Sequence, residues 1–374
     1  MEKILQVTSC FQYGGTEAYI MNNYRNIDKQ NFKFDFWFFH EDNSPYEEEI
    51  INLGGEIYHG ELPKIQRILF FIIGLVKHMK TNGPYDVVHS HVNLMNGWVM
   101  LAAFIGGVRV RVSHSHATSG KDTSNIIKKL YYRVSENMIK LFSTRKLACS
   151  KDAGNYLYGN REFSLYGEVV NNGIDICNFI NKNAKAISKL KHEFNIPENH
   201  LIIGNITRFE PKKNTEFTIE IFKKLIEIEP NSILVLGGVD GGQLSHIKEK
   251  VCELNIEDKV RFIGVRKDVY DWLHVMDVYL FPSLYEGLGI VLLEAQAAGV
   301  KCFASTGVSK EVDVGLGLVD FIELNEGPKY WAKHILKNLN NSMVSSKVIA
   351  TTFDKSGYSV KLSIKRIEEI YKGE

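Results

Sequence analysis

The sequence Val278-Tyr-Leu-Phe-Pro-Ser-Leu-Tyr-Glu-Gly-Leu-Gly-Ile-Val-Leu-Leu-Glu-Ala-Gln-Ala-Ala298 decides the fold of this chain. The apolar run Val278–Phe281 predicts a strand that ends at Pro282-Ser283. A loop with Gly287 and Gly289 follows, and the residues after it predict a helix that runs to Ala298. A strand, a glycine loop and a helix in this order are typical of a parallel βαβ unit, so this stretch predicts an α/β fold.

Outward from this stretch, short apolar runs alternate with helical patterns along most of the chain. At 374 residues and 44% hydrophobic content, the chain is too long for one ordinary core. The sequence therefore predicts two doubly wound, Rossmann-like halves. Ligands of such sheets bind at the carboxyl ends of the strands, so we expect the halves to face a central cleft that holds the active site. The predicted strands are Ile4–Thr8, Lys33–Phe39, Val87–Ser90, Val108–Ser113, Leu201–Ile206, Ser232–Leu236, Val260–Ile263, Val278–Phe281 and Lys301–Ala304.

The turn-rich stretch Asn171-Asn-Gly-Ile-Asp175 predicts the boundary between the halves. We expect one domain over residues 1–170 and a second over residues 171–356. A charged helix over residues 357–374 closes the chain, and we expect it to pack back on the first domain.

Composition excludes several classes of function. The net charge is +1, which gives no global field for nucleic acid. The start of the chain lacks the apolar core of a signal peptide and runs directly into a predicted strand. The cysteines are scattered without a C-x-x-C pair, which predicts reduced thiols in a cytoplasmic protein and no zinc site. They are Cys10, Cys149, Cys177, Cys252 and Cys302.

Two segments combine apolar and basic residues. Ile68–Val76 is about half as long as a membrane span and has basic flanks, so we favour a core helix over a helix that rests on anionic lipid. Lys121–Lys151 interleaves cations with apolar side chains, which predicts either an amphipathic helix with a solvated basic face or a surface for anionic lipid. The flanking cations of the first segment are Lys64, Arg67, Lys77 and Lys80, and only Asp122 and Glu136 oppose the cations of the second.

Two loops of the second half carry candidate binding residues. Arg208 and Lys213 follow the first strand of that half and precede a helix, a position from which two cations can bind a diphosphate and stabilise it as it leaves. In the glycine loop, Glu286 can hydrogen-bond sugar hydroxyls. Glu294 lies about two turns into the following helix and can reach a ribose; in that apolar helix, its carboxylate is costly without a partner.

The first half offers two weaker patterns. Tyr13-Gly14-Gly15-Thr16-Glu17 lets the backbone approach a ligand at a helix start, although two glycines alone also fit an ordinary turn. His89 and His91 form one His-Ser-His pair at a strand end, and His114 and His116 form another. We expect one histidine of each pair to face the cleft and the other to pack, and we expect no metal site.

At these residues the chain resembles glycosyltransferase family 4, the retaining family with the GT-B fold. The likeness covers nearly the whole chain, and its overall pattern is similar to bacterial enzymes of capsule and exopolysaccharide assembly. It rests on the order and spacing of the motifs. These are Gly14-Gly-Thr-Glu17, a histidine after Val108–Ser113, Asn172-Gly-Ile-Asp175, Arg208 with Lys213-Asn214, Gly264-x-Arg266-x-Asp268-Val269 and the pair Glu286 and Glu294.

The resemblance implies that the second domain binds a nucleotide-sugar donor, most simply a UDP-sugar, and the first a glycan or lipid-linked acceptor. Gly15 would approach the donor phosphates, Arg208 and Lys213 would bind the diphosphate, and the main chain at Val265-Arg266 would receive the base. Glu286 would contact the sugar, Gly287, Leu288 and Gly289 would offer amides, and Glu294 would bind the ribose. His116 would orient the reacting sugar, although His114 also fits the family's single cleft histidine. Acceptor-side candidates are Thr16, Glu17, His91 and His114.

The resemblance further implies transfer with retention, without a metal or a cofactor. The leaving phosphate itself would take the acceptor's proton, so no carboxylate base would be needed. Two alternatives remain open on sequence. A nucleotide-sugar 2-epimerase of the same fold needs acid and base carboxylates around the sugar, and a non-catalytic binding subunit needs none of them. Peripheral association with an anionic membrane also remains open.

Overall fold

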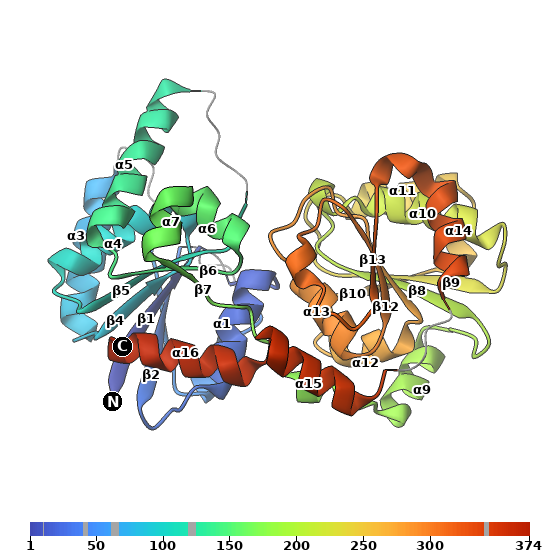
Figure 1. Cartoon of the computed structure of the whole chain (residues 1–374), viewed down its shortest axis with the longest axis horizontal. Coiled ribbons are helices and arrows are strands. Elements are labelled where there is room, and N and C mark those ends of the chain that lie inside the picture. Colours follow the sequence, from blue (N-terminus) through green and yellow to red (C-terminus); the bar gives the residue numbers. More distant parts are fainter. Residues whose placement is uncertain (10, 40–43, 61–66, 119–124, 340–343) are drawn as a thin grey trace. The chain divides into compact units, whose positions relative to one another are not determined.

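The computed structural model describes residues 1–9, 11–39, 44–60, 67–118, 125–339 and 344–374. The chain forms two compact units, and each is described by itself (Figure 1). Unit 1 contains Met1–Gly173 and Val360–Glu374, and unit 2 contains Ile174–Ser359. The boundaries expected from sequence, after residues 170 and 356, lie a few residues earlier. Cys10, Lys64, Lys121 and Asp122 lie outside the described residues.

Unit 1 is built on a seven-stranded parallel sheet with the strand order β3-β2-β1-β4-β5-β6-β7. The chain adds strands to one side of β1 and then returns to add β4 on the other side. This reversal between β1 and β4 is the switch point of a doubly wound sheet. The strands are β1 Glu2–Thr8, β2 Phe32–Phe38, β3 Glu56–His59, β4 Val87–Ser90, β5 Val110–Ser115, β6 Arg145–Ala148 and β7 Gly167–Val169.

Helices cover both faces of this sheet, because successive strand residues such as Ile4 and Leu5 point to opposite faces and both are buried. Ile4 belongs to a core shared with α1 (Gly15–Asn26) and the closing helix α16 (Val360–Lys372). Leu5 belongs to the core under α3 and α4. The other helices of unit 1 are α2 Glu47–Asn52, α3 Ile68–Asn82, α4 Asn96–Ile105, α5 Ile126–Phe142, α6 Lys151–Tyr158 and α7 Asn160–Tyr166.

Unit 2 is built on a six-stranded parallel sheet with the order β10-β9-β8-β11-β12-β13. Its switch point lies between β8 and β11, in the same relative place as in unit 1. The strands are β8 Leu201–Ile206, β9 Ser232–Gly237, β10 Val260–Gly264, β11 Val278–Phe281, β12 Lys301–Ser305 and β13 Val319–Ile322.

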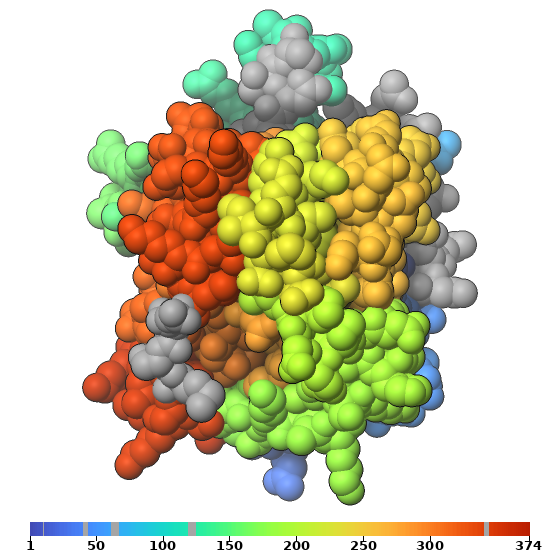
Figure 2. All heavy atoms as spheres, turned by 90° about the vertical axis from the view of Figure 1, so that its right-hand side faces the viewer, coloured from blue at the N-terminus to red at the C-terminus, as the bar shows by residue number. Residues whose placement is uncertain are grey.

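Two groups of helices sandwich the second sheet. Figure 2 shows one group, in which α14, α10 and α11 lie next to one another, coloured from red-orange through yellow to amber. Their buried side chains, including Phe222 and Trp331, share one core with the sheet. The other core holds Trp272 and Leu292. The helices are α8 Ile176–Ile180, α9 Ala184–Glu193, α10 Thr215–Ile226, α11 Leu244–Glu253, α12 Val269–Val275, α13 Ile290–Ala297, α14 Gly327–Lys337 and α15 Ser346–Ser356.

The predicted class, two doubly wound Rossmann-like units, is confirmed. Three strands, Val87–Ser90, Leu201–Ile206 and Val278–Phe281, occupy the predicted residues. The strand predicted at Val108–Ser113 runs instead from Val110 to Ser115, which places His114 inside it. Four strands were not predicted, namely β3, β6, β7 and β13. Three of them are sheet edges, and β6 lies inside the basic segment that we expected to be helical.

Helix α3 is only partly a core helix. It buries Phe71 and Leu75, but Leu69, Phe70 and Ile73 on its other side are 56% to 73% exposed. The basic segment after residue 124 forms α5, whose first turns extend past the other helices of unit 1 (Figure 1). In the described part of the chain, no helix has the length and apolar character that a bilayer span requires.

Candidate functional site

The loops after β8 and β11 meet at the switch point of unit 2. Parallel neighbouring strands bring their carboxyl ends to the same edge of the sheet, so the two loops lie beside each other. The Leu284 amide donates to the Lys212 carbonyl over 2.8 Å, and the Asn214 side chain donates to the Pro282 carbonyl over 3.2 Å. The structure therefore brings together the residues predicted on these two loops.

Lys213 and Glu286 form an ion pair across the loops. Their side chains are 14% and 11% exposed, so the pair is largely shielded from solvent. The Lys213 ammonium also lies 5.2 Å from the centre of the Phe281 ring, within the range of a cation–π contact. The two predicted binding groups thus neutralise each other.

Arg208, like Lys213, follows strand β8, and it is partly buried. The next residue, Phe209, holds the loop after β8 in place. Phe209 pairs with Asp240 in an isolated bridge, and the Phe209 carbonyl accepts from the Gly241 amide over 3.0 Å. This fixed backbone places a second cation on the loop that carries Lys213.

The glycine loop before α13 leaves several amides unused. Gly289 is the residue before α13 and has φ +81°, a conformation that favours glycine. The Glu286 amide donates to the Gly307 carbonyl over 3.1 Å, which anchors the start of the loop. Among the described residues, the amides of Gly287, Leu288 and Gly289 have no hydrogen-bond acceptor. They are placed at a helix start, where backbone amides bind anions and hydroxyl oxygens.

Glu294 lies in α13 with a partly buried side chain, and burial raises the pKa of its carboxyl to about 7. No cation or hydrogen-bond donor in the described part of the chain pairs with this carboxylate. A carboxylate without a partner is costly in such surroundings, and ribose hydroxyls that donate to it would remove the cost.

The raised pKa of Glu294 predicts a pH-dependent gain in stability for Glu294→Gln. The folded protein binds the proton more tightly than the unfolded chain, so the stability from this group is complete below pH 4.5 and is lost as the pH rises through about 7. At pH 8 the variant should gain up to about 3 kcal/mol, whereas the two proteins should agree near pH 4.5. Thermal unfolding at both pH values measures this.

Glu249→Gln makes the same change at an exposed position on α11 and serves as the control. If Glu294→Gln had the same effect on the unfolding temperature at both pH values, the carboxyl would not be held in a desolvated state.

In the loop after β10, the Arg266 side chain is engaged within the loop itself. Its guanidinium makes two hydrogen bonds to Asp268, at 2.8 and 2.6 Å, and lies 5.8 Å from the Trp272 ring. Val265 next to it is 49% exposed. Arg266 therefore shapes the loop, and only the backbone at Val265-Arg266 is left for a ligand.

The predicted residues of unit 1 lie at its own switch point. Gly15 is the first residue of α1, directly followed by Thr16 and Glu17, and the Gly14 carbonyl accepts from the Ala18 amide over 2.9 Å. Glu17 places a negative charge in the first turn of this helix. A helix start with its own carboxylate attracts an anion less strongly than a neutral one.

The expectation that one histidine of each pair packs and the other does not is wrong for His89 and His91, which are 1% and 5% exposed, whereas His114 is 0% exposed and His116 is partly exposed. All four imidazoles lie in one cluster, because residues two apart on a strand point to the same face. Ring centres are 4.2 Å apart for His89 and His91, and also 4.2 Å apart for His114 and His116. Burial lowers the pKa of each histidine, to about 3 for His116 and well below the ordinary value for the other three. The four rings are therefore neutral.

The cluster includes two residues that sequence analysis missed, Gln6 on β1 and Tyr371 on α16. The Gln6 side chain contacts His91 Nε2 at 2.9 Å and the Tyr371 hydroxyl at 3.0 Å, and that hydroxyl lies 2.7 Å from His89 Nδ1. Tyr371 is separated from His89 by 282 positions. No local spacing could have indicated this contact.

Three of these histidines could also hold a metal ion. One ring nitrogen each of His89, His91 and His114 lies within 4.8 Å of the others. Imidazole is a common zinc ligand, but four-coordinate zinc needs nitrogens about 2.0–2.1 Å from one centre. The described residues supply no carboxylate or thiolate to this group.

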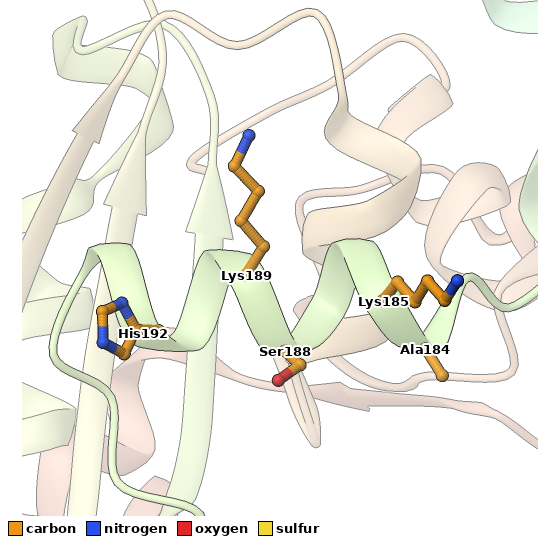
Figure 3. A pocket seen from close by; sticks show the side chains of 5 residues that line it. All are labelled: Ala184, Lys185, Ser188, Lys189 and His192. Atoms are coloured by element: carbon orange, nitrogen blue, oxygen red, sulfur yellow. The ribbon is translucent and has the colours of Figure 1, made fainter.

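A shallow hollow on unit 2 contains none of the predicted site residues. Its lining residues all belong to α9, and Figure 3 shows their side chains spread along the helix and pointing in different directions. Such a surface has no convergent groups that would fix a ligand. The residues that line the hollow are Ala184, Lys185, Ser188, Lys189 and His192.

Comparisons with known proteins place the chain among the glycosyltransferases. Residues 13–177 match the family described as "Glycosyltransferase Family 4", and residues 186–343 match "Glycosyl transferases group 1". The chain is 34% identical over 373 residues to the putative glycosyltransferase EpsF of Bacillus subtilis, covering 99% of this chain and 96% of the relative. It is 26% identical over 376 residues to the capsular polysaccharide biosynthesis glycosyltransferase CapH of Staphylococcus aureus, covering 99% of each.

Among solved structures, the chain is similar to HepE of Anabaena in complex with UDP and glucose. The TM-score is 0.81 at 18% identity, and the match covers 100% of both chains. At this identity the likeness shows the fold, which is the two-sheet GT-B architecture.

Proposed function

This chain belongs to the glycosyltransferases, with a family 4 region and a group 1 region, and on that premise we propose that it moves a sugar from a UDP-sugar to a glycan or lipid-linked acceptor during assembly of a surface polysaccharide. The relative CapH, a capsular polysaccharide biosynthesis glycosyltransferase, supports the polysaccharide role. The UDP in the similar HepE structure supports the nucleotide.

The observation that carries the proposal is the grouping at the switch point of unit 2. Lys213 and Glu286 lie paired there, and Arg208 is on the same loop as Lys213. The three unused amides of residues 287–289 begin α13, which carries Glu294. Cations and amides suit a diphosphate, and carboxylates suit the hydroxyls of a sugar and a ribose. This set suits the chemical parts of a nucleotide-sugar.

In the reaction that we propose, the bond between the anomeric carbon and the diphosphate oxygen breaks while the acceptor oxygen bonds to the same carbon from the same face. The acceptor's proton passes to the departing phosphate oxygen, so configuration is retained and no carboxylate base is needed. Arg208, Lys213 and the loop amides stabilise the charge that builds on the diphosphate. Glu286 binds sugar hydroxyls, Glu294 the ribose, and the main chain at Val265-Arg266 the base.

In unit 1 we propose His116 as the residue that orients the reacting sugar and Gly15 as an approach point for phosphate. Thr16 and Glu17 are the candidates on the acceptor side, whereas His91 and His114, also expected there, are 5% and 0% exposed and lie behind His116. No metal takes part in this scheme, because Arg208 and Lys213 supply the positive charge.

A panel of UDP-, GDP- and ADP-sugars in a thermal-shift assay, followed by product analysis with the best binder, tests this function. We expect a UDP-sugar to raise the unfolding temperature most and its transferred sugar to keep the anomeric configuration. Transfer should continue in excess EDTA. A product of inverted configuration would contradict the retention mechanism, and loss of transfer in EDTA would contradict the metal-free scheme.

We also propose that unit 1 rests on anionic lipid when it meets a lipid-linked acceptor. The first turns of α5 expose Ile126, Ile127 and Leu130 beside Lys129 and Arg133, and all five side chains are exposed. Apolar residues with adjacent cations on one helix are typical of interfacial binding.

Reversing the charges in a Lys129→Glu, Arg133→Glu variant should lower binding to vesicles with anionic lipid by at least about tenfold, since each basic residue near such a surface contributes about 1 kcal/mol. Co-sedimentation measures the bound fraction. Lys347→Glu with Lys355→Glu on α15 makes the same charge change in unit 2 and is the control. Equal binding of both variants would contradict the assignment of α5.

A further inference from the structure

We propose that Gln6 sets the direction of a hydrogen-bond network in which all four clustered histidines carry their proton on Nε2, so that His116 presents Nδ1 as an acceptor to a substrate hydroxyl. Gln6 and His91 are then positioning residues for His116. That the hydroxyl belongs to a sugar rests on the proposed sugar transfer. The positions of the protons on the four imidazoles rest on the hydrogen bonds alone.

The first branch of the network runs from Gln6 to His116. The Gln6 oxygen Oε1 lies 2.9 Å from His91 Nε2, and an amide oxygen can only accept, so His91 carries its proton on Nε2. His91 Nδ1 is then an acceptor. Since it lies 2.9 Å from His116 Nε2, His116 must donate from that nitrogen. His116 Nδ1 is left with a lone pair.

The second branch runs from Gln6 through Tyr371 to His114. The Gln6 amide nitrogen donates to the Tyr371 hydroxyl over 3.0 Å, and the hydroxyl proton points to His89 Nδ1 at 2.7 Å. His89 therefore carries its proton on Nε2 and donates to His114 Nδ1 over 3.1 Å. His114 consequently carries its proton on Nε2 as well.

Both branches depend on the neutral state of the rings, since a neutral imidazole has one donor and one acceptor. Burial favours this state for all four histidines, and no carboxylate in the described part of the chain pairs with them. Turning the Gln6 amide by half a turn would exchange its donor and acceptor and move the proton of all four rings to Nδ1. The orientation of one side chain thus determines the tautomers of four histidines.

The two ends of the network have no partner among the described residues. They are His116 Nδ1, an acceptor, and His114 Nε2, a donor. His114 is fully buried, whereas His116 is partly exposed as a residue, so His116 lies nearer the surface. Its Nδ1 atom is itself buried and has to be uncovered before a substrate hydroxyl can reach it. A buried acceptor without a donor is unfavourable, and a sugar hydroxyl that donates to it would satisfy it.

Two-bond proton–nitrogen NMR of the full chain labelled with ¹⁵N-histidine tests the assignment without substrate, with signals assigned from single His→Asn variants. We expect His89, His91, His114 and His116 each to show an unprotonated Nδ1 and a protonated Nε2. An Nδ1-protonated form of His91 or His116 would overturn the proposal. So would a change in the four signals after one equivalent of Zn²⁺, because the lone pairs would then serve a metal.

Two variants test whether the two hydrogen bonds of the Gln6 side chain, rather than its packing, fix the tautomers. Tyr371→Phe cuts only the second branch, so His91 and His116 should keep the Nε2 form while His89 and His114 lose their single tautomer. Gln6→Met cuts both branches, so all four should show mixed tautomers. If Tyr371→Phe disturbed His116, or if Gln6→Met disturbed neither branch, Gln6 would not set the direction. If Gln6→Met does not fold, the wild-type spectrum and Tyr371→Phe still decide.

Transfer kinetics then connect the network to the sugar. Gln6→Met should lower kcat with little change in the KM for the donor, and by more than Tyr371→Phe does, because Tyr371→Phe leaves the branch to His116 intact. A kcat unchanged by Gln6→Met would separate the tautomers from catalysis and overturn the role of His116 Nδ1. If no sugar transfer is found at all, the NMR result still stands on its own.

Discussion

Replacing Lys213 by alanine is expected to lower kcat by roughly 10²- to 10³-fold, the loss that follows when one preorganised group that stabilises transition-state charge is removed. Arg208→Ala should have an effect of the same order, because both cations follow β8 and are proposed to meet the same diphosphate. Single-turnover transfer from the best donor of the nucleotide-sugar panel measures the rate. Circular dichroism and the unfolding temperature verify that the fold is intact.

The adjacent Lys212→Ala provides a matched control. Lys212 carries the same charge on the same loop, but its ammonium pairs with Glu210 at 3.2 Å and is 37% exposed. Its link to Leu284 uses the backbone carbonyl, which alanine keeps. Turnover of Lys212→Ala should stay near wild type. Full activity in Arg208→Ala or Lys213→Ala would refute the proposed donor site.

Changing Glu286 to glutamine is expected to separate binding from turnover. The carboxylate holds Lys213 when no donor is bound, so its removal should free the ammonium and tighten the binding of UDP about three- to tenfold, equivalent to the contribution of one ion pair of about 1 kcal/mol. Turnover should fall by on the order of 10²-fold, because the sugar loses a charged hydrogen-bond partner. Calorimetry with UDP and transfer kinetics measure the two effects.

The double variant Lys213→Ala, Glu286→Gln decides whether the pair acts as one unit. Groups in direct contact give non-additive effects, so the double variant should bind UDP no more weakly than Lys213→Ala alone. If Glu286→Gln weakened UDP binding instead, Glu286 would not compete with the diphosphate for Lys213.

The parallel architecture was predictable because its central strands are buried on both faces and read as continuous apolar runs. Leu201–Ile206 and Val278–Phe281 are examples, and both occupy the predicted residues. Edge strands such as β3, with Glu56 at its start, lack this signal because one side of the strand has no neighbour. β6 begins with Arg145-Lys146 inside a basic segment, so its composition gave no indication of a strand. Its place in the sheet depends on pairing with β5 and β7, which is a tertiary effect.

The grouping of the unit 2 site was predictable for the same reason, since loops after neighbouring parallel strands share one edge. What could not be predicted was the direct pairing of Lys213 with Glu286, which are 73 positions apart. The histidine cluster was not predicted, because the two histidines of a pair were expected to differ in what they face. Residues two apart on a strand point to the same face. Gln6 and Tyr371 lie outside any recognisable motif, and only the folded sheet and α16 bring them to the histidines.

The closing helix has a consequence for how the molecule is made. Ile364, Ile367, Ile370 and Tyr371 of α16 belong to the core of unit 1, although the chain completes all of unit 2 before it reaches them. During synthesis from the N-terminus, the ribosome therefore releases a complete unit 2 while unit 1 still lacks part of its interior. Nascent chains that stop before residue 360 leave apolar surface around Ile4 and Phe34 uncovered, and quality control can recognise them by it. Translation of α16 thus supplies the part of the core that the first unit still lacks.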